Sequence, residues 1–403
     1  MKKILSDLAI FGGMPTFAEN IHVGRPNIGN RERLLERIDD LLERRWFTNN
    51  GPFVQEFEQR IADLLGVKHC IAMCNGTIAL EIAIRATGLS GEVIIPSFTF
   101  IATAHALQWQ EIRPVFCDID PHTHTIDPRQ VERLITPRTS GIIGVHLWGR
   151  ACNVKSLNEI AHQHNLKLLF DAAHAFGCSY SGRMIGCFGD AEVFSFHATK
   201  CLNTFEGGAV TTNNYELASK IRLMKNFGFA GYDNVTYIGT NGKMSEIAAA
   251  MGITGLENLE IITATNYANY KQYQTELKNI AGVNLIIYDE TQKCNYHNIV
   301  LEIDESASIV HRDQLVDILH AENILARRYF YPGCHRMEPY RSYFPHAGLL
   351  LPETERLAKR VLSLPTGTAV SSEDINKICE IVRIVVTNAY KVQEKLQRRE
   401  TRI

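Results

Sequence analysis

The feature that most constrains the fold is an alternation of short apolar runs with helical stretches between residues 70 and 212. The apolar runs are Cys70 to Met73, Val93 to Ile95, Val115 to Ile119, Ile142 to Leu147, Leu166 to Phe170, Val193 to Phe196 and Ala209 to Thr212. Helical spacing falls between them at Ile78 to Thr87, Ala102 to Gln110 and Val154 to His164. Strands that are apolar throughout and separated by helices indicate a mainly parallel sheet covered on both faces. We therefore predict an α/β fold in which ligands bind beyond the carboxyl ends of the strands.

The pattern changes after about residue 245. A long helical stretch, roughly 245 to 280, leads into apolar runs at Val283 to Ile287 and Ile299 to Ile303, and then into helices near Arg312 to Glu322 and from Ser372 to the end. This pattern is typical of a smaller α+β domain attached by a long helix. A chain of 403 residues is too long for one ordinary core. We predict a large domain over residues 1–255, including an N-terminal arm, and a small C-terminal domain over residues 256–403.

Composition narrows the class of partner. The chain has 42 Lys and Arg against 44 Asp and Glu, so its charge gives no support for binding nucleic acid or an anionic membrane. No stretch approaches the roughly 20 apolar residues of a membrane span. The ten cysteines and the histidine pairs His122/His124 and His162/His164 lack metal-type spacing, so no metal site is predicted. Scattered reduced thiols are typical of a cytoplasmic protein.

Three polar motifs follow three of the predicted strands. Asn75-Gly76-Thr77 lies directly before a helix, where free amides and a hydroxyl suit a phosphate, although an ordinary helix cap fits equally well. Asp171 ends a buried strand and could pair with a ring nitrogen or cap a helix. Lys200 lies at a strand-to-turn junction, five positions after Ser195. A phosphate cradle, an acid for a ring nitrogen and an amine for an aldehyde together indicate pyridoxal 5′-phosphate.

A set of runs resembles a known family: Asn75 to Thr77, Pro96 to Ala104, Val145 to Gly149, Asp171 to Ala175, Ser195 to Lys200 and Glu206 to Ala209. In order and spacing these runs resemble the DegT/DnrJ/StrS family of sugar aminotransferases, and the resemblance covers about residues 52 to 365. It implies aminotransferase fold type I, with a mainly parallel seven-stranded sheet in the large domain and a smaller α+β C-terminal domain. Asn203 to Gly208 and Gly239 to Glu246 look most like the enzymes that aminate dTDP-4-dehydro-6-deoxyglucose.

The resemblance also implies roles for individual residues. Lys200 would bind the cofactor covalently and then move the proton, while Asp171 would pair with the pyridine nitrogen. Further cofactor contacts would come from Gly76, Thr77, Phe100, His174, Ser195 and, from the neighbouring subunit, Asn241. Many relatives have Asn-Tyr-Arg-Met where this chain has Asn241-Gly242-Lys243-Met244, so the contacts of that tyrosine and arginine are not transferred. Candidate substrate contacts are Arg25, Asn27, Asn49, Tyr331 and His335.

From this resemblance we predict a cytoplasmic homodimer whose subunits share the active site. It would move an amino group from L-glutamate to the 4-keto group of dTDP-4-dehydro-6-deoxy-D-glucose, for deoxyamino sugars of the O-antigen or lipopolysaccharide kind. Two alternatives stay open: the same chemistry on a GDP-linked, UDP-linked or 3-keto sugar, and a binding or regulatory homologue without catalysis. The intact set of Asp171, Ser195 and Lys200 weighs against the second alternative.

Overall fold

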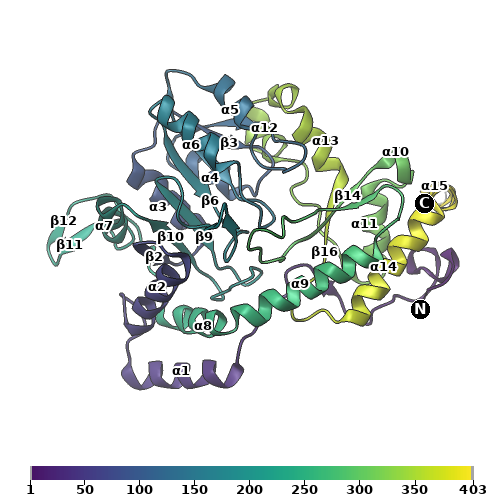
Figure 1. Ribbon diagram of the computed structural model, residues 1–403, viewed down its shortest axis with the longest axis horizontal. Helices are drawn as coiled ribbons and strands as arrows, with labels where there is room; N and C mark the ends of the chain where they lie inside the picture. The colour runs from purple at the N-terminus through teal and green to yellow at the C-terminus, as the bar shows by residue number, and fades with distance from the viewer. Residues whose placement is uncertain (1, 401–403) are drawn as a thin grey trace.

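A seven-stranded sheet lies at the centre of the computed structural model, which describes residues 2–400 (Figure 1). Its strands are β2 (His69–Met73), β3 (Glu92–Pro96), β4 (Arg113–Cys117), β5 (Thr139–Val145), β6 (Lys167–Asp171), β9 (Ala191–Ser195) and β10 (Gly208–Thr212). They lie in the order β2-β10-β9-β6-β5-β3-β4, and only β10 is antiparallel to its neighbours. The predicted seven-stranded, mainly parallel sheet is confirmed. Two strands begin and end earlier than predicted, since β4 ends at Cys117 and β5 at Val145.

Helices cover both faces of this sheet. On one face lie α3 (Gly76–Thr87), α4 (Ala102–Gln108) and α7 (Tyr215–Met224); on the other lie α2 (Pro52–Leu65), α5 (Pro128–Leu134), α6 (Val154–Gln163) and α8 (Glu246–Glu257). Successive strand residues point to opposite faces, so Val93 and Ile95 enter one core while Ile94 enters the other. Both cores are apolar, which explains why the strands read as continuous apolar runs.

The stretch predicted as one long helix is two helices that meet at Asn258. Helix α9 (Leu259–Glu276) follows α8 directly, and the two helices are bent by 61° relative to each other. The side-chain amide of Asn258 donates to the Thr254 carbonyl (2.9 Å), while its backbone N–H bonds Gly255 instead, so the helical ladder breaks there. Among residues 2–400 no single helix is long and apolar enough to cross a membrane. Only the bent pair α8 and α9, taken together, meets such a test of length and composition, and α8 is largely buried in the protein.

The C-terminal part has a core of its own around a three-stranded sheet. The sheet consists of β13 (Val283–Leu285), β14 (Ile299–Ile303) and β16 (Val361–Leu364), and the main helices packed with it are α9, α11 (Arg312–Ala321) and α14 (Ser372–Thr387). A break at Asn388 separates α14 from α15 (Ala389–Glu400), which the sequence predicted as one helix. Shorter elements are β7 (Ser179–Tyr180), β8 (Arg183–Met184), β11 (Phe229–Gly231), β12 (Asn234–Val235), α10 (Glu305–Ser308), α12 (Tyr340–Tyr343) and α13 (Pro352–Arg360).

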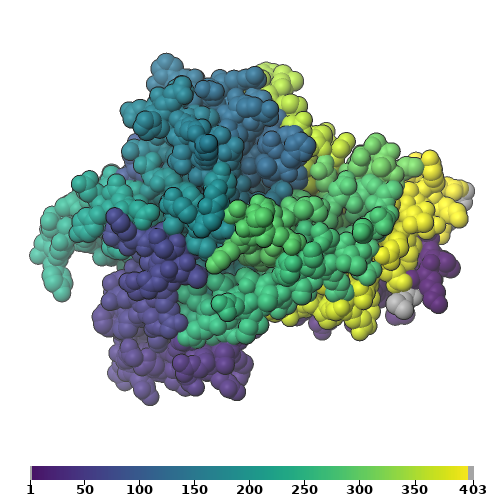
Figure 2. Space-filling model, in the orientation of Figure 1, coloured from purple at the N-terminus to yellow at the C-terminus, as the bar shows by residue number. Residues whose placement is uncertain are grey.

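The N-terminal segment packs with this C-terminal core and not with the large sheet. Leu5, Leu8 and Phe17 are buried there, and β1 (Ile21–His22) pairs in parallel with β15 (Ile324–Leu325). The buried carboxylate of Glu322 accepts hydrogen bonds from the Ala9 and Thr16 backbones, which anchors the segment. Figures 1 and 2 show the purple N-terminal residues beside the yellow C-terminal helices. Residues 2 to about 24, which the sequence assigned to the large domain, thus pack with the C-terminal core, and the predicted division at residue 255 stays a prediction.

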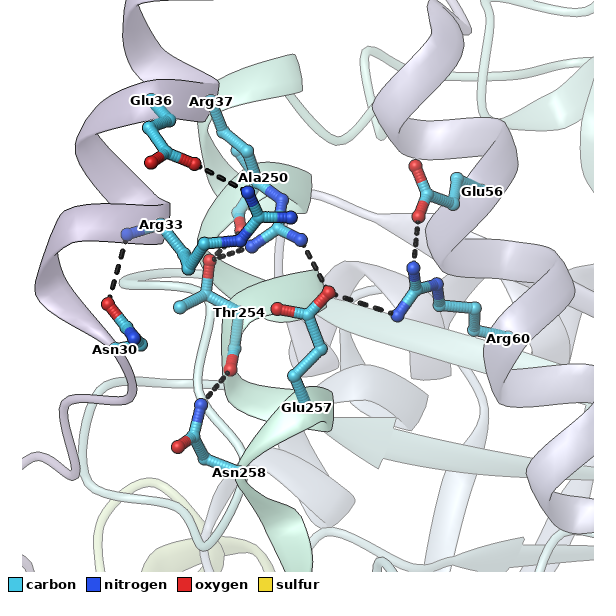
Figure 3. A network of polar contacts seen from close by, with 10 residues as sticks. All are labelled: Asn30, Arg33, Glu36, Arg37, Glu56, Arg60, Ala250, Thr254, Glu257 and Asn258. Atoms are coloured by element: carbon cyan, nitrogen blue, oxygen red, sulfur yellow. Dashed lines mark hydrogen bonds and ion pairs between the residues drawn. The ribbon is translucent and has the colours of Figure 1, made fainter.

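Helix α1 (Arg31–Arg44) joins the large unit through a polar network (Figure 3). The helix begins at Asn30, whose side chain accepts a hydrogen bond from the Arg33 backbone N–H (3.0 Å). Arg37 donates to Thr254 Oγ1 (2.7 Å) and pairs with Glu257, both on α8, and Arg60 of α2 pairs with the same carboxylate (3.3 Å). Three helices thus converge on one glutamate, and the loop of residues 45–51 is held between α1 and α2.

Candidate active site

A pocket of about 340 Å³ opens at the carboxyl ends of β2, β5, β6 and β9. It is lined by the predicted cofactor contacts Gly76, Thr77, Phe100, Asp171, His174, Ser195 and Lys200. Residues more than 120 positions apart in the chain are brought together because parallel strands end at one edge of the sheet. The opposite wall comes from the C-terminal part and includes Arg327, Tyr329 and Phe330.

The beginning of α3 forms one end of the pocket. Asn75 caps the helix, since its Oδ1 accepts a hydrogen bond from the Ile78 N–H (2.8 Å). As the first two helical residues, Gly76 and Thr77 have N–H groups with no acceptor inside the helix, and these groups can bind an anion. A β-carbon on Gly76 would lie 2.9 Å from Ser195 Cβ, closer than real contacts allow. The motif therefore caps the helix, and the missing side chain of Gly76 leaves open a space beside amides that can bind an anion.

Asp171 ends β6 with its side chain almost buried. Its Oδ2 accepts a hydrogen bond from Thr103 Oγ1 (2.9 Å) and its Oδ1 accepts one from the Ala173 N–H (3.1 Å). Each carboxylate oxygen can accept more than one hydrogen bond, so Asp171 can still receive a proton donor from a ligand in the pocket. The two neighbours hold the carboxylate in place for that contact.

Lys200 lies in a loop that leaves the sheet after β9. Hydrogen bonds from Thr204 N–H to the Phe196 carbonyl (2.9 Å) and from Phe196 N–H to the Gly207 carbonyl (2.8 Å) close the loop at its base. His297 of the C-terminal part donates from Nε2 to the Thr199 carbonyl (2.8 Å) and so fixes the turn beside the lysine. Burial lowers the pKa of Lys200 from 10.5 to about 8, although the charge of Asp171 acts in the opposite direction. A sizeable fraction of the amine is then neutral, and hence nucleophilic, near neutral pH.

His174 belongs to an aromatic stack beside the lysine. Its ring lies 5.7 Å from the ring of Trp148 and 6.0 Å from that of Phe330, with nearly parallel planes. Burial, and next the charge of Lys200, lower the pKa of His174 well below its usual value, so the imidazole is neutral. Its Nδ1 is buried and has no hydrogen-bond partner within residues 2–400. A neutral ring whose Nδ1 is not hydrogen-bonded suits contact with a flat, polar ligand.

Comparisons with known proteins agree with this geometry. Residues 29–383 match the DegT/DnrJ/EryC1/StrS aminotransferase family. The chain belongs to this family. It is 39% identical over 365 residues to dTDP-4-amino-4,6-dideoxy-D-glucose transaminase of Shigella dysenteriae, covering 90% of this chain and 98% of that one.

Two further relatives show how far the similarity extends. This aminotransferase is 34% identical to GDP-perosamine synthase of Caulobacter vibrioides, over 89% of this chain and 96% of that one. The crystal structure of DesI with its TDP-sugar product superimposes with a TM-score of 0.94 at 49% identity, covering 98% of this chain and all of that one. The predicted family, fold and enzyme class are confirmed.

Pyridoxal 5′-phosphate is the cofactor of this family of aminotransferases, as the sequence predicted. The pocket residues fit it: Gly76 and Thr77 offer amides to a phosphate, Asp171 offers a carboxylate to a ring nitrogen, and Lys200 offers an amine. The unused Nδ1 of His174 is a further contact for a polar atom on the ring. When bound, the cofactor supplies an aldehyde that carries the amino group and a ring that delocalises negative charge.

Two residues predicted to contact substrate are buried in the interior of this aminotransferase. Asn27 is 2% exposed; its Nδ2 donates to the Cys201 carbonyl (3.2 Å) and its Oδ1 accepts from Thr368 Oγ1 (2.9 Å). His335 is equally buried, with Nδ1 bonded to Ser97 Oγ (2.6 Å) and Nε2 to Glu355 (2.7 Å). The polar atoms of both side chains are used within the fold, and substrate binding by either residue stays a prediction.

Four other predicted residues lie outside the pocket of this chain and stay predictions. Arg25 and Asn241 are exposed, and Asn49 lines a separate hollow together with Lys225 and Lys243. The ring of Tyr331 contacts two guanidinium groups, those of Arg312 (5.1 Å) and Arg328 (5.4 Å). Their positions are compatible with contacts made to a second subunit or to an extended substrate.

Sequence reasoning missed the wall formed by Arg327, Tyr329 and Phe330. The aromatic run around residue 330 did draw attention to this loop, but it favoured Tyr331 and His335. Phe330 stacks on Trp148 (5.4 Å) and thereby reaches the pocket, whereas Tyr331 points to the arginines outside it. Thr103, which positions Asp171, was missed as well, because nothing in the sequence marks a threonine on one helix as the neighbour of a strand-end aspartate.

Proposed function

We propose that this aminotransferase moves the amino group of L-glutamate to the 4-keto group of dTDP-4-dehydro-6-deoxy-D-glucose, giving dTDP-4-amino-4,6-dideoxy-D-glucose. The observation that carries the reaction type is the amine of Lys200, with its lowered pKa, in one pocket with Asp171. The choice of sugar is supported by the names of the relatives, a transaminase of this amino sugar and a protein crystallised with a TDP-sugar product.

Each residue of the pocket has its own role in this reaction. The neutral Nζ of Lys200 first holds the cofactor and, once released, takes a proton from the donor and returns one to the sugar carbon. Asp171 stabilises a positive charge on the ring nitrogen, and the Gly76 and Thr77 amides with the Ser195 hydroxyl hold the phosphate. The aromatic wall around Phe330 keeps water away from the reacting atoms.

A panel of keto sugar nucleotides tests the proposal. Protein reconstituted with pyridoxal phosphate and L-glutamate should aminate the dTDP-linked 4-keto sugar with the highest kcat/KM, and Lys200→Ala should abolish turnover. The second candidate is a GDP-linked 4-keto sugar, which the similarity to GDP-perosamine synthase favours. Turnover of the GDP-linked sugar alone would overturn the choice of nucleotide, and a wild-type protein inactive on every keto sugar would overturn the function.

We also propose a homodimer whose two subunits share each active site. The hairpin of β11 and β12 projects from the body of the protein (Figure 1), and with the turn after it exposes Phe229, Tyr232, Val235 and Ile238. Apolar side chains grouped on a projection are typical of an interface, here with a second copy. Asn241 follows closely along the chain, is exposed and does not line its own pocket, as expected of a residue that serves the partner's pocket.

Mixing two inactive variants tests the shared site. If Asn241 serves the neighbouring pocket, Lys200→Ala and Asn241→Ala subunits refolded together form heterodimers with one intact site. About a quarter of wild-type activity should return. Activity that stays absent in heterodimers confirmed by mass would contradict sharing through Asn241.

The compartment and the fate of the product are also proposals. All ten cysteines are unpaired, which fits the reducing cytoplasm. The amino sugar would enter the synthesis of a surface polysaccharide such as the O-antigen.

A further inference from the structure

Arg327 is a cation held in a defined place on the wall of the pocket. It follows β15, and its backbone N–H and carbonyl pair with those of Ser363 in β16 (3.1 and 2.8 Å). Its guanidinium lies 5.2 Å from the centre of the Tyr329 ring, a cation–π contact that orients the side chain. Both Arg327 and Tyr329 line the pocket.

The charges around the pocket leave this guanidinium without an acidic partner. Asp171 is engaged by Thr103 and Ala173, and Glu206 lies 3.5 Å from His197. No carboxylate among the side chains that the structure describes lies within ion-pair distance of Arg327. An arginine that faces a cavity unpaired is available to an anion that enters with a ligand.

The next residue provides the contrast. Arg328 forms an ion pair with Asp313 (2.9 Å), lies over the Tyr331 ring and does not line the pocket. The two adjacent arginines therefore differ in the one property of interest, because the charge of Arg328 is neutralised within the fold while that of Arg327 faces the pocket.

We propose that Arg327 binds an anionic group of a substrate and so sets the affinity of the site for it. This inference rests on the proposed function, in which the amino donor carries carboxylates and the nucleotide sugar carries a diphosphate. A planar guanidinium binds either group through two parallel hydrogen bonds, whereas a lysine supplies only a point charge. The cofactor phosphate has its own donors at the beginning of α3, so Arg327 serves the substrates and not the cofactor.

Separate measurements of the two half-reactions identify which anion is bound. Arg327→Gln should raise KM at least about tenfold for one substrate, the loss expected for a hydrogen bond between charged groups. A rise for L-glutamate alone identifies the donor carboxylate, and a rise for the sugar nucleotide alone identifies the diphosphate. Arg327→Lys should recover only part of the loss, and the dissociation constant for pyridoxal phosphate should change less than about threefold in both variants.

Arg328→Gln is the matched control and should keep both KM values within about twofold of wild type. Thermal midpoints confirm that the variants fold. Unchanged KM values for both substrates in Arg327→Gln would overturn the inference, and so would an equal effect of Arg328→Gln or a lost affinity for the cofactor. These outcomes are read in a wild-type background that turns over, so they are distinct from failure of the proposed function, in which the wild type itself is inactive.

Discussion

Replacing Asp171 by asparagine separates the two electrostatic effects that act on Lys200. Burial lowers the pKa of the lysine to about 8, and the carboxylate of Asp171 acts against this shift. At pH 7.5, roughly a quarter of the amines are neutral at a pKa of 8, against about one in a thousand at the ordinary value, a gain of roughly 200-fold in reactive amine. Asparagine has nearly the same shape and keeps one acceptor oxygen, which can still bond Thr103 Oγ1, but it lacks the charge. The pKa of Lys200 should therefore fall further in Asp171→Asn.

Competitive labelling measures this pKa in cofactor-free protein, where the ring chemistry of the cofactor does not interfere. Trace acetic anhydride is added at pH values from about 6 to 11, and acetylation of the Lys200 peptide is quantified by mass spectrometry. The exposed Lys68 in the same digest corrects for the reactivity of the reagent. Wild-type Lys200 should titrate near pH 8 and the variant at a lower pH. A wild-type midpoint near 10.5, or a higher midpoint in Asp171→Asn, would refute the reasoning.

Three further substitutions test the structure. In Gly76→Ala the added β-carbon would lie 2.9 Å from Ser195 Cβ, and the variant should bind the cofactor roughly 5- to 150-fold more weakly in a fluorescence titration, the equivalent of about 1–3 kcal/mol of overpacking. Gly231→Ala is the control, because its added β-carbon would meet only Asn234 Cβ at an ordinary contact distance of 4.0 Å. Equal affinities of Gly76→Ala and the wild type would contradict the cradle. Glu246→Ala removes the carboxylate that accepts a hydrogen bond from the Phe53 N–H (2.7 Å) at the start of α2. The free energy of unfolding, measured in urea, should fall by about 1–3 kcal/mol. A fall below about 0.5 kcal/mol would show that water replaces the carboxylate. Glu257→Gln weakens the network of Figure 3 and should lower the free energy of unfolding by about 0.5–1 kcal/mol, because the arginine partners of Glu257 are only partly buried. A larger fall would show that these ion pairs are stronger than their exposure to solvent allows.

Most of the fold was predicted from local patterns of apolar residues. The helix boundaries that were predicted wrongly have local causes that these patterns do not show. The apolar runs became strands because each is buried on both faces. The two long helices predicted near the C-terminal part break at Asn258 and Asn388, where the side-chain amide bonds a carbonyl four residues earlier. Asparagine is tolerated in a helix often enough that its presence alone does not predict such a break.

In the candidate site, too, some residues could be identified from the sequence and others could not. Gly76, Asp171 and Lys200 could be read from the sequence because each adjoins the end of a strand, and the ends of parallel strands meet. The sequence could not show that the side chains of Asn27 and His335 are bonded within the fold, because a polar residue that serves the fold looks the same in sequence as one that serves a ligand. Only burial and the hydrogen-bond partners distinguish the two.

By itself the sequence determined the α/β class, the seven strands, the cofactor and three residues that line one pocket, Gly76, Asp171 and Lys200, since strand periodicity and strand-end motifs are properties of short stretches of chain. The tertiary structure decided what closes the pocket. It brought Arg327 and Phe330 to face Lys200 and left Arg328 and Tyr331 outside, and it placed the N-terminal segment on the C-terminal core. These outcomes depend on how two separately formed cores pack against each other. That packing is set by contacts between residues more than a hundred positions apart, which no local pattern records.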